Sequence, residues 1–208
     1  PGLESRMSLS WFSSLLLFAL ITCGTPGPNN MLLTTAAAHG GFRRSVPLLF
    51  AVVGGLNLLM LVTALGVAGI VLGIPGAQLL LKLLGSGYLL WLAWRQARAG
   101  EPGQGQRTQP LGFVGAALFQ WVNPKAWMMG VNTAILFLPS GSGWWTAASL
   151  ALVCIAVNLP CVAVWAVAGD CLRHRLHDPL ALRAFNLSMA ALLAGTALWI
   201  LVEATLSH

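Results

Sequence analysis

The chain has 208 residues, of which 57% are hydrophobic and only 8% are charged, whereas about 25% of the residues in soluble domains are charged. Eleven bases and five acids cannot cover the surface of a soluble globule of this size, so the soluble enzyme classes are largely excluded. We therefore expect an all-α integral membrane protein in contact with a lipid bilayer. Because a spanning helix uses about 20 residues, roughly six or seven helices would occupy nearly the whole chain.

Six apolar runs predict six transmembrane helices. Residues 1–6 precede Met7 and resemble an expression-tag remnant, so we set them aside. The apolar runs that follow lie at 10–33, 46–72, 77–95, 111–138, 144–169 and 182–203.

The connections between these runs alternate in charge. The first, third and fifth connections carry eight arginines, whereas the second and fourth carry no charged residue. The positive-inside rule places the basic connections in the cytoplasm, and both termini are then predicted to lie outside. The positive-inside rule thus explains the net charge of +6, and we expect no nucleic-acid partner.

A linker divides the chain into two halves of three helices. Residues 99–110 are rich in Gly, Pro and Gln and are predicted to form a cytoplasmic linker between a first repeat, residues 7–98, and a second repeat, residues 111–208. Three is an odd number of spans, so the two repeats must be inverted relative to each other. Proline and asparagine motifs recur in the same order in both halves, which supports a 3+3 inverted repeat.

Prolines are expected to break helices one and four. Pro26, Pro28 and Pro124 cannot donate a hydrogen bond to the carbonyl four residues earlier, and lipid offers that carbonyl no other partner. Irregular backbone at membrane depth is tolerated where it is buried in protein or lines a cavity, so paired breaks indicate a central site. Ordinary proline kinks are the alternative. The candidate substrate-binding residues are Thr25, Pro26, Gly27, Pro28, Asn29, Asn30, Asn57, Asn123, Pro124, Lys125 and Asn158.

Lys125 is the ionisable residue predicted to lie deepest in the membrane, roughly 20 Å from the cytoplasmic start of helix four. Such a residue is a functional candidate by default. Its counter-charge could be a substrate carboxylate or the carbonyls freed by the prolines, or the lysine could be neutral. A purely structural lysine held by carbonyls is the alternative. The nearby amides could bind ammonium and carboxylate groups without adding charge.

Other residue types favour packing over chemistry. The four cysteines lack C-x-x-C spacing and are read as small core residues. His174 and His177 have the spacing of two metal ligands but no evident third one, so we expect no metal. Glycine pairs such as Gly54-Gly55 are expected to allow close helix packing. With no nucleophile elbow, no phosphate loop and no pair of intramembrane acids, we expect neither an enzyme nor a cofactor.

Several motifs together resemble the LysE/RhtB family of amino-acid exporters. They are Thr25-Pro26-Gly27-Pro28-Asn29, Lys82-x-x-Gly85-x-x-Tyr88-Leu89, Asn123-Pro124-Lys125-Ala126 and Asn158-Leu159-Pro160. The resemblance covers nearly the whole chain from Met7. It implies a bacterial inner-membrane secondary transporter that exports amino acids, with protons as the coupled ion. The oligomeric state, monomer or homodimer, stays open.

The substrate is expected to enter from the cytoplasm and to bind between helices one and four. Its carboxylate would face half-helix N-termini and Lys125, and its other groups would face Asn29, Asn57 and Asn158. Because we expect no carboxylate within the span interiors, a neutral amino acid is predicted rather than a cationic one. A transmembrane thiol-disulfide electron carrier of similar architecture is the alternative, although it would need one redox cysteine in each half.

Overall fold

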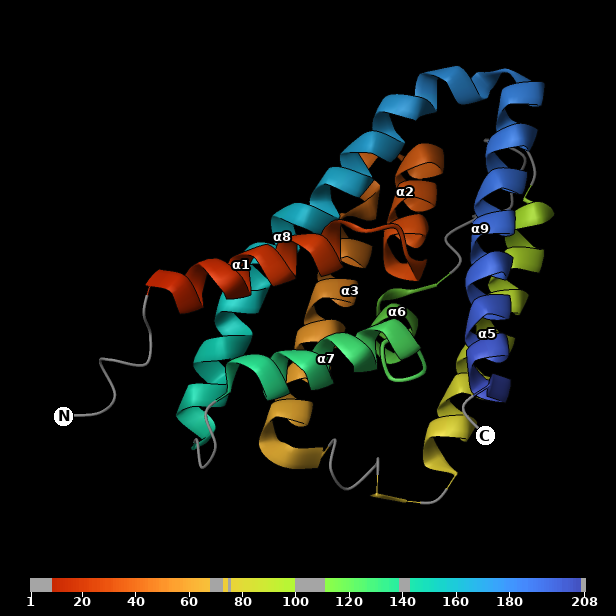
Figure 1. Cartoon of the computed structure of the whole chain (residues 1–208). Helices are drawn as coiled ribbons and strands as arrows, with labels where there is room; N and C mark the ends of the chain where they lie inside the picture. The colour runs from red at the N-terminus through yellow and green to blue at the C-terminus, as the bar shows by residue number, and fades with distance from the viewer. Residues whose placement is uncertain (1–8, 68–72, 75, 100–110, 139–142, 207–208) are drawn as a thin grey trace.

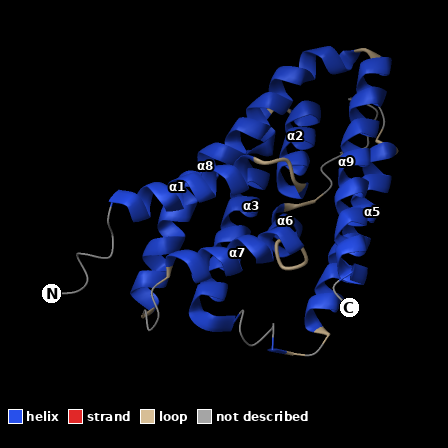
Figure 2. Cartoon of the chain, in the orientation of Figure 1, coloured by secondary structure: helices blue, strands red, loops and turns tan. Residues whose placement is uncertain are grey.

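The computed structural model describes residues 9–67, 73–74, 76–99, 111–138 and 143–206. These residues form helices and connecting turns, with no strand among them (Figure 2), which confirms the expected all-α class. The tag remnant and nearly all of the predicted linker lie outside the described residues. The helices are α1 (Leu9–Gly24), α2 (Pro28–Gly40), α3 (Phe42–Val62), α5 (Ala77–Ala97), α6 (Phe113–Phe119), α7 (Pro124–Phe137), α8 (Trp144–Arg173) and α9 (Pro179–Leu206), with a π-turn η1 (Thr63–Val67) and a 3-10 turn η2 (His174–His177).

Three helical segments are long and apolar enough to cross a membrane. They are Phe42–Gly66, Trp144–His177 and Pro179–Ala204, and the bent pair α1–α2 counts as a fourth span if its two parts cross together. Of the other predicted spans, α5 carries Lys82 and Arg95, and the fourth is divided between α6 and α7. The described residues therefore show a multi-pass membrane protein.

Both helices that were predicted to break are broken. Between α1 and α2 the chain bends by 57° across Gly24 to Pro28. In the second half, α6 ends at Phe119, and α7 begins at Pro124 after a short turn. In both places a proline opens the new half-helix, where its fixed φ is favourable and its missing N–H is not needed.

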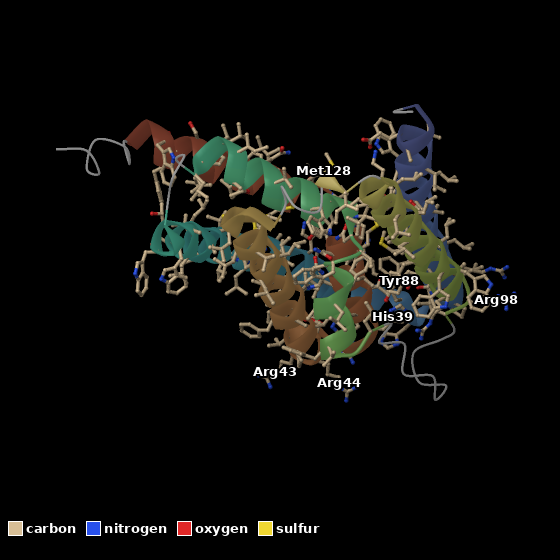
Figure 3. All side chains as sticks on the ribbon, turned by 90° about the horizontal axis from the view of Figure 1, so that it is seen from below. His39, Arg43, Arg44, Tyr88, Arg98 and Met128 are labelled. Carbon is tan, nitrogen blue, oxygen red and sulfur yellow. The ribbon has the colours of Figure 1, made fainter. Side chains whose placement is uncertain are left out.

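The half-helices α1 and α7 contact each other, and α1 crosses α8 (Figures 1 and 3). Behind them, α2 packs on α8, α3 packs on both α6 and α8, and α5 packs on α9 (Figure 1). The two breaks therefore meet at the centre of the molecule.

Glycines allow the backbones to approach closely at three contacts. A Cβ atom at Gly55 would lie 2.6 Å from the carbonyl oxygen of Ala117, whereas at the adjacent Gly54 it would meet no atom within 4 Å. Gly85 faces the carbonyl of Val122 in the same way, and Gly169 faces that of Thr34. The predicted close packing is thus confirmed for Gly55. Gly54 points into open space.

Large apolar side chains cover the outward faces of the helices. Met128 is 58% exposed on α7, Ile135 is 72% exposed and Trp199 on α9 is 74% exposed. Figure 3 shows Met128 on the side of α7 that faces away from the rest of the chain. Such a surface is suited to a hydrocarbon environment and not to water.

The two adjacent glycines of α3 give a test of the close packing between α3 and α6. Gly55→Ala should push α6 away from α3 and destabilise the fold by about 1–3 kcal/mol, as overpacking does. Gly54→Ala should leave stability unchanged or raise it, because alanine favours helix and its methyl group has space. Thermal unfolding in detergent compares the two variants. Equal melting temperatures would contradict the close contact between α3 and α6.

Candidate functional site

The side chain of Asn30 holds the break in helix one. Its Nδ2 donates to the carbonyl of Cys23 at 2.8 Å and to that of Thr25 at 2.9 Å. Asn30 is only 4% exposed, and buried carbonyls left without donors would be costly. One amide on α2 thus satisfies two carbonyls at the end of α1.

Lys125, the second residue of α7, reaches across to the same end of α1. Its Nζ donates to Thr25 Oγ1 at 2.9 Å, to the Thr25 carbonyl at 3.1 Å and, more weakly, to the Pro26 carbonyl at 3.5 Å. A helix C-terminus carries partial negative charge, so an ammonium group is favoured there. Of the counter-charges considered from sequence, the structure shows backbone carbonyls at the break, those of Thr25 and Pro26. The carbonyls four residues before the two prolines of this break are those of Thr22 and Gly24.

The second break is fixed by a cluster of three amides. Asn123 caps α7, since its Oδ1 accepts the backbone N–H of Lys125 at 3.2 Å. Asn29 and Gln120 exchange two hydrogen bonds of 2.9 Å, and Asn123 Nδ2 donates to Asn29 Oδ1 at 3.5 Å. These bonds join the start of α2 to the turn between α6 and α7. The breaks therefore support each other across the molecule.

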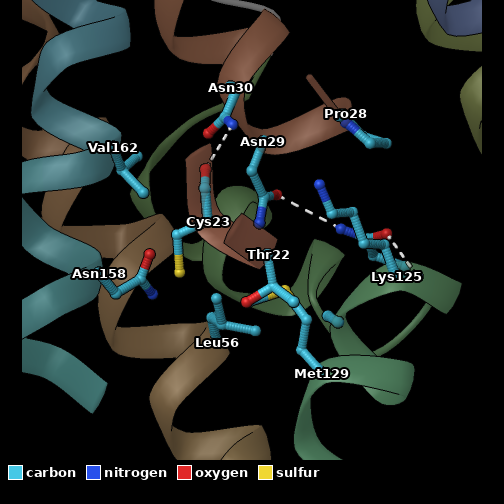
Figure 4. Close-up of a pocket in the computed structure, with 13 residues that line it drawn as sticks. Thr22, Cys23, Pro28, Asn29, Asn30, Leu56, Lys125, Met129, Asn158 and Val162 are labelled. Atoms are coloured by element: carbon cyan, nitrogen blue, oxygen red, sulfur yellow. Dashed lines mark hydrogen bonds between the residues drawn. The ribbon is translucent and has the colours of Figure 1, made fainter. Parts of the chain in front are cut away.

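A pocket lies where the two breaks meet. Its empty volume is about 310 Å³, including the part open to solvent. Figure 4 shows Asn158 of α8 pointing into it on one side and Lys125 of α7 on the other, with Asn29 between them. The pocket is lined by Thr22, Cys23, Gly27, Pro28, Asn29, Asn30, Leu56, Asn123, Lys125, Ala126, Met129, Asn158 and Val162.

Two polar features of this pocket lack protein partners in the described part of the chain. The N-cap of α2, Gly27, makes no side-chain bond to the first N–H groups of the helix, which have no intrahelical acceptors. Asn158 is 2% exposed, and neither its Nδ2 nor its Oδ1 has a hydrogen-bond partner. An uncapped helix N-terminus attracts an anion, and a free amide can bind a donor or an acceptor. The pocket can therefore hold a small ligand that has an anionic end and further polar groups.

The structure brings together most of the predicted site residues. Seven of the eleven line the pocket: Gly27, Pro28, Asn29, Asn30, Asn123, Lys125 and Asn158. The other four are not among the lining residues: Thr25 and Pro26 bind Lys125, Pro124 begins α7, and Asn57 donates to the Val53 carbonyl of its own helix at 2.8 Å.

Sequence reasoning missed two kinds of residue at this site. Gln120 is fully buried and binds Asn29, and a polar amide inside an apolar predicted span was a signal that could have found it. The apolar and small lining residues, such as Leu56 and Met129, carry no such signal because they resemble ordinary core residues. Spatial proximity alone identifies them.

Neither redox nor metal chemistry is indicated by the described residues. All four cysteines are free thiols, and Cys23 and Cys154 are buried in an apolar cluster. No group of three or more potential metal ligands occurs in the described ranges.

Comparisons with known proteins agree with this picture. A Klebsiella pneumoniae protein named cysteine/O-acetylserine efflux protein is 34% identical over 201 residues, covering 95% of this chain and all of the relative. A protein of the same name from Escherichia coli O1:K1 is 33% identical over 196 residues, 90% of this chain and 95% of the relative. No solved structure matches the chain significantly.

The family model described as LysE type translocator matches residues 20–204, nearly the whole described chain. This match excludes an enzyme and favours transport over the electron-carrier alternative. The chain belongs to the LysE type translocator family and is an amino-acid efflux transporter of the membrane.

Proposed function

We propose that the protein has six spans arranged as a 3+3 inverted repeat, with α1–α2 corresponding to α6–α7, α3 to α8, and α5 to α9. Several contacts between helices support this correspondence. The contact of α2 with α8 matches that of α7 with α3, while α3 with α8 and α5 with α9 are contacts between corresponding helices. Residues 7–98 and 111–208 would then be the two repeats. An inverted repeat of this kind supports alternating access around a central site.

The proposed substrate is a small neutral amino acid such as cysteine or O-acetylserine. Relatives that cover nearly the whole chain carry these two substrates in their names. The described lining of the pocket contains one lysine and no acid. A cationic side chain would therefore be buried without a counter-charge, which is costly.

The substrate carboxylate would bind at the N-terminus of α2, beside Lys125. The weak contact of Lys125 with the Pro26 carbonyl, at 3.5 Å, can be exchanged for a carboxylate oxygen while both bonds to Thr25 stay in place. The substrate ammonium would donate to Asn158 Oδ1. The single observation that carries this proposal is the buried Asn158 amide, unpartnered among described residues, opposite the uncapped start of α2.

Export would run from the cytoplasm across the bacterial inner membrane, driven by the proton-motive force, with both chain termini outside. The support for this orientation is the arginine-rich odd connections. The support for proton coupling is family resemblance.

Uptake into inside-out membrane vesicles tests this function. Labelled O-acetylserine and cysteine should accumulate, labelled lysine should not, and a protonophore should abolish accumulation. Vesicles without the protein are the control. Transport of lysine in preference to the neutral amino acids would contradict the proposed substrate class, and accumulation that survives the protonophore would contradict the energy source.

Replacing Lys125 tests the carboxylate site. Lys125→Ala should weaken O-acetylserine binding at least tenfold, because it removes the cation beside the start of α2. Lys125→Arg should restore little, since a planar guanidinium does not replace a compact ammonium. Calorimetric titration of the purified protein measures both. Lys82→Ala is the matched control, because Lys82 pairs with Glu203 at 3.4 Å and lines neither pocket described here. Unchanged affinity in Lys125→Ala would assign the lysine to structure alone.

A further inference from the structure

A second pocket adjoins the first between α1, α3, α7 and α8. Its empty volume is about 230 Å³. Four residues, Thr22, Cys23, Met129 and Asn158, line both pockets, so the two are neighbouring compartments with a shared wall. The second pocket is lined by Phe18, Ala19, Thr22, Cys23, Met60, Met129, Thr133, Cys154 and Asn158.

One hydroxyl in this pocket is exceptional. Thr22, Thr34 and Thr196 each donate their hydroxyl to a carbonyl of their own helix, at 2.8–2.9 Å. Thr133 makes no such bond: its Oγ1 has no partner among the described residues, although the residue is only 3% exposed. A buried polar group left unpaired destabilises the protein. A ligand that supplied the missing partner would remove this destabilisation.

The remainder of the lining selects against charge. Its described residues include no acid and no base, and Met60, Met129, Cys23 and Cys154 provide polarisable sulfur. Methionine side chains adapt to irregular apolar shapes, and cysteine behaves as a small hydrophobic residue. The pocket thus combines an apolar wall with two unsatisfied polar side chains, those of Thr133 and Asn158.

We propose that this second pocket receives the side chain of the exported amino acid, and that Thr133 is a specificity-determining residue that donates its hydroxyl to an acceptor on that side chain. The inference rests on the proposed function, in which the α-carboxylate and ammonium occupy the first pocket. Asn158 stands at the junction and can bind the substrate on both sides. The substrate class is then an amino acid with a short, uncharged side chain that carries an oxygen acceptor or a sulfur atom. An ester such as that of O-acetylserine has this chemistry.

The test compares O-acetylserine with norleucine, which has a side chain of the same length without the ester oxygens. Thr133→Val removes the hydroxyl and keeps the shape. It should weaken O-acetylserine binding about tenfold, which corresponds to about 1.4 kcal/mol, and leave norleucine binding unchanged. Thr196→Val, the same change on α9 at a hydroxyl bonded to Leu192, is the control and should alter neither. Calorimetric titration of the purified proteins gives the affinities.

A second variant tests the space in the pocket. Ala19 is 6% exposed and lines the second pocket but not the first. Ala19→Leu should fill the second pocket, so that O-acetylserine no longer binds while alanine, with its single methyl group, still does. Retained alanine binding also shows that the variant is folded.

The outcomes separate this inference from the function on which it rests. If the native protein binds O-acetylserine but Thr133→Val affects O-acetylserine and norleucine equally, or affects neither, the side-chain pocket is wrong and the exporter function stands. Loss of alanine together with O-acetylserine in a folded Ala19→Leu protein would also overturn the pocket. If the native protein binds no neutral amino acid, both proposals fail.

Discussion

Backbone carbonyls left without helical donors at the break between α1 and α2 are the constraint on which this structure depends. In water these carbonyls would be hydrated, whereas at membrane depth they need a partner from the protein. At the end of α1 the partners are Asn30 from α2 and Lys125 from α7. The hydrogen bonds at the break in the first half therefore include a donor from the second half. The same contacts fix the position of α7 beside α1.

This arrangement divides the polar side chains near the breaks into two groups. Asn30, Asn123 and Gln120 use their amides on the protein itself and hold the half-helices in place. Asn158 and Thr133 keep unpartnered polar atoms although they are buried among described residues. The first group gives the pocket its shape, and the second group is available to a ligand. A substrate that binds between them would complete hydrogen bonds that the folded chain leaves open.

The sequence predicted the local breaks well because proline acts on its own backbone. A missing N–H at Pro28 or Pro124 removes a helical hydrogen bond in any fold, so breaks could be expected there from the sequence. Pro160, by contrast, lies within the continuous helix α8. The partners across the breaks could not be predicted, because they depend on how helices far apart in sequence pack. Lys125 illustrates the difference: its depth marked it as important, but two counter-charges and a neutral state were open until its Nζ was placed on the Thr25 carbonyl. Likewise, nothing in the sequence distinguishes Thr133 from threonines that bond to their own helix.

The most direct measurement is a structure of the protein determined with O-acetylserine bound. We predict that the substrate carboxylate lies within hydrogen-bonding distance of the N–H groups of Asn29 and Asn30 at the start of α2, and that Asn30 still donates to the carbonyls of Cys23 and Thr25. A ligand bound away from the two helix breaks, or a straight helix through Gly24 to Pro28, would contradict the account.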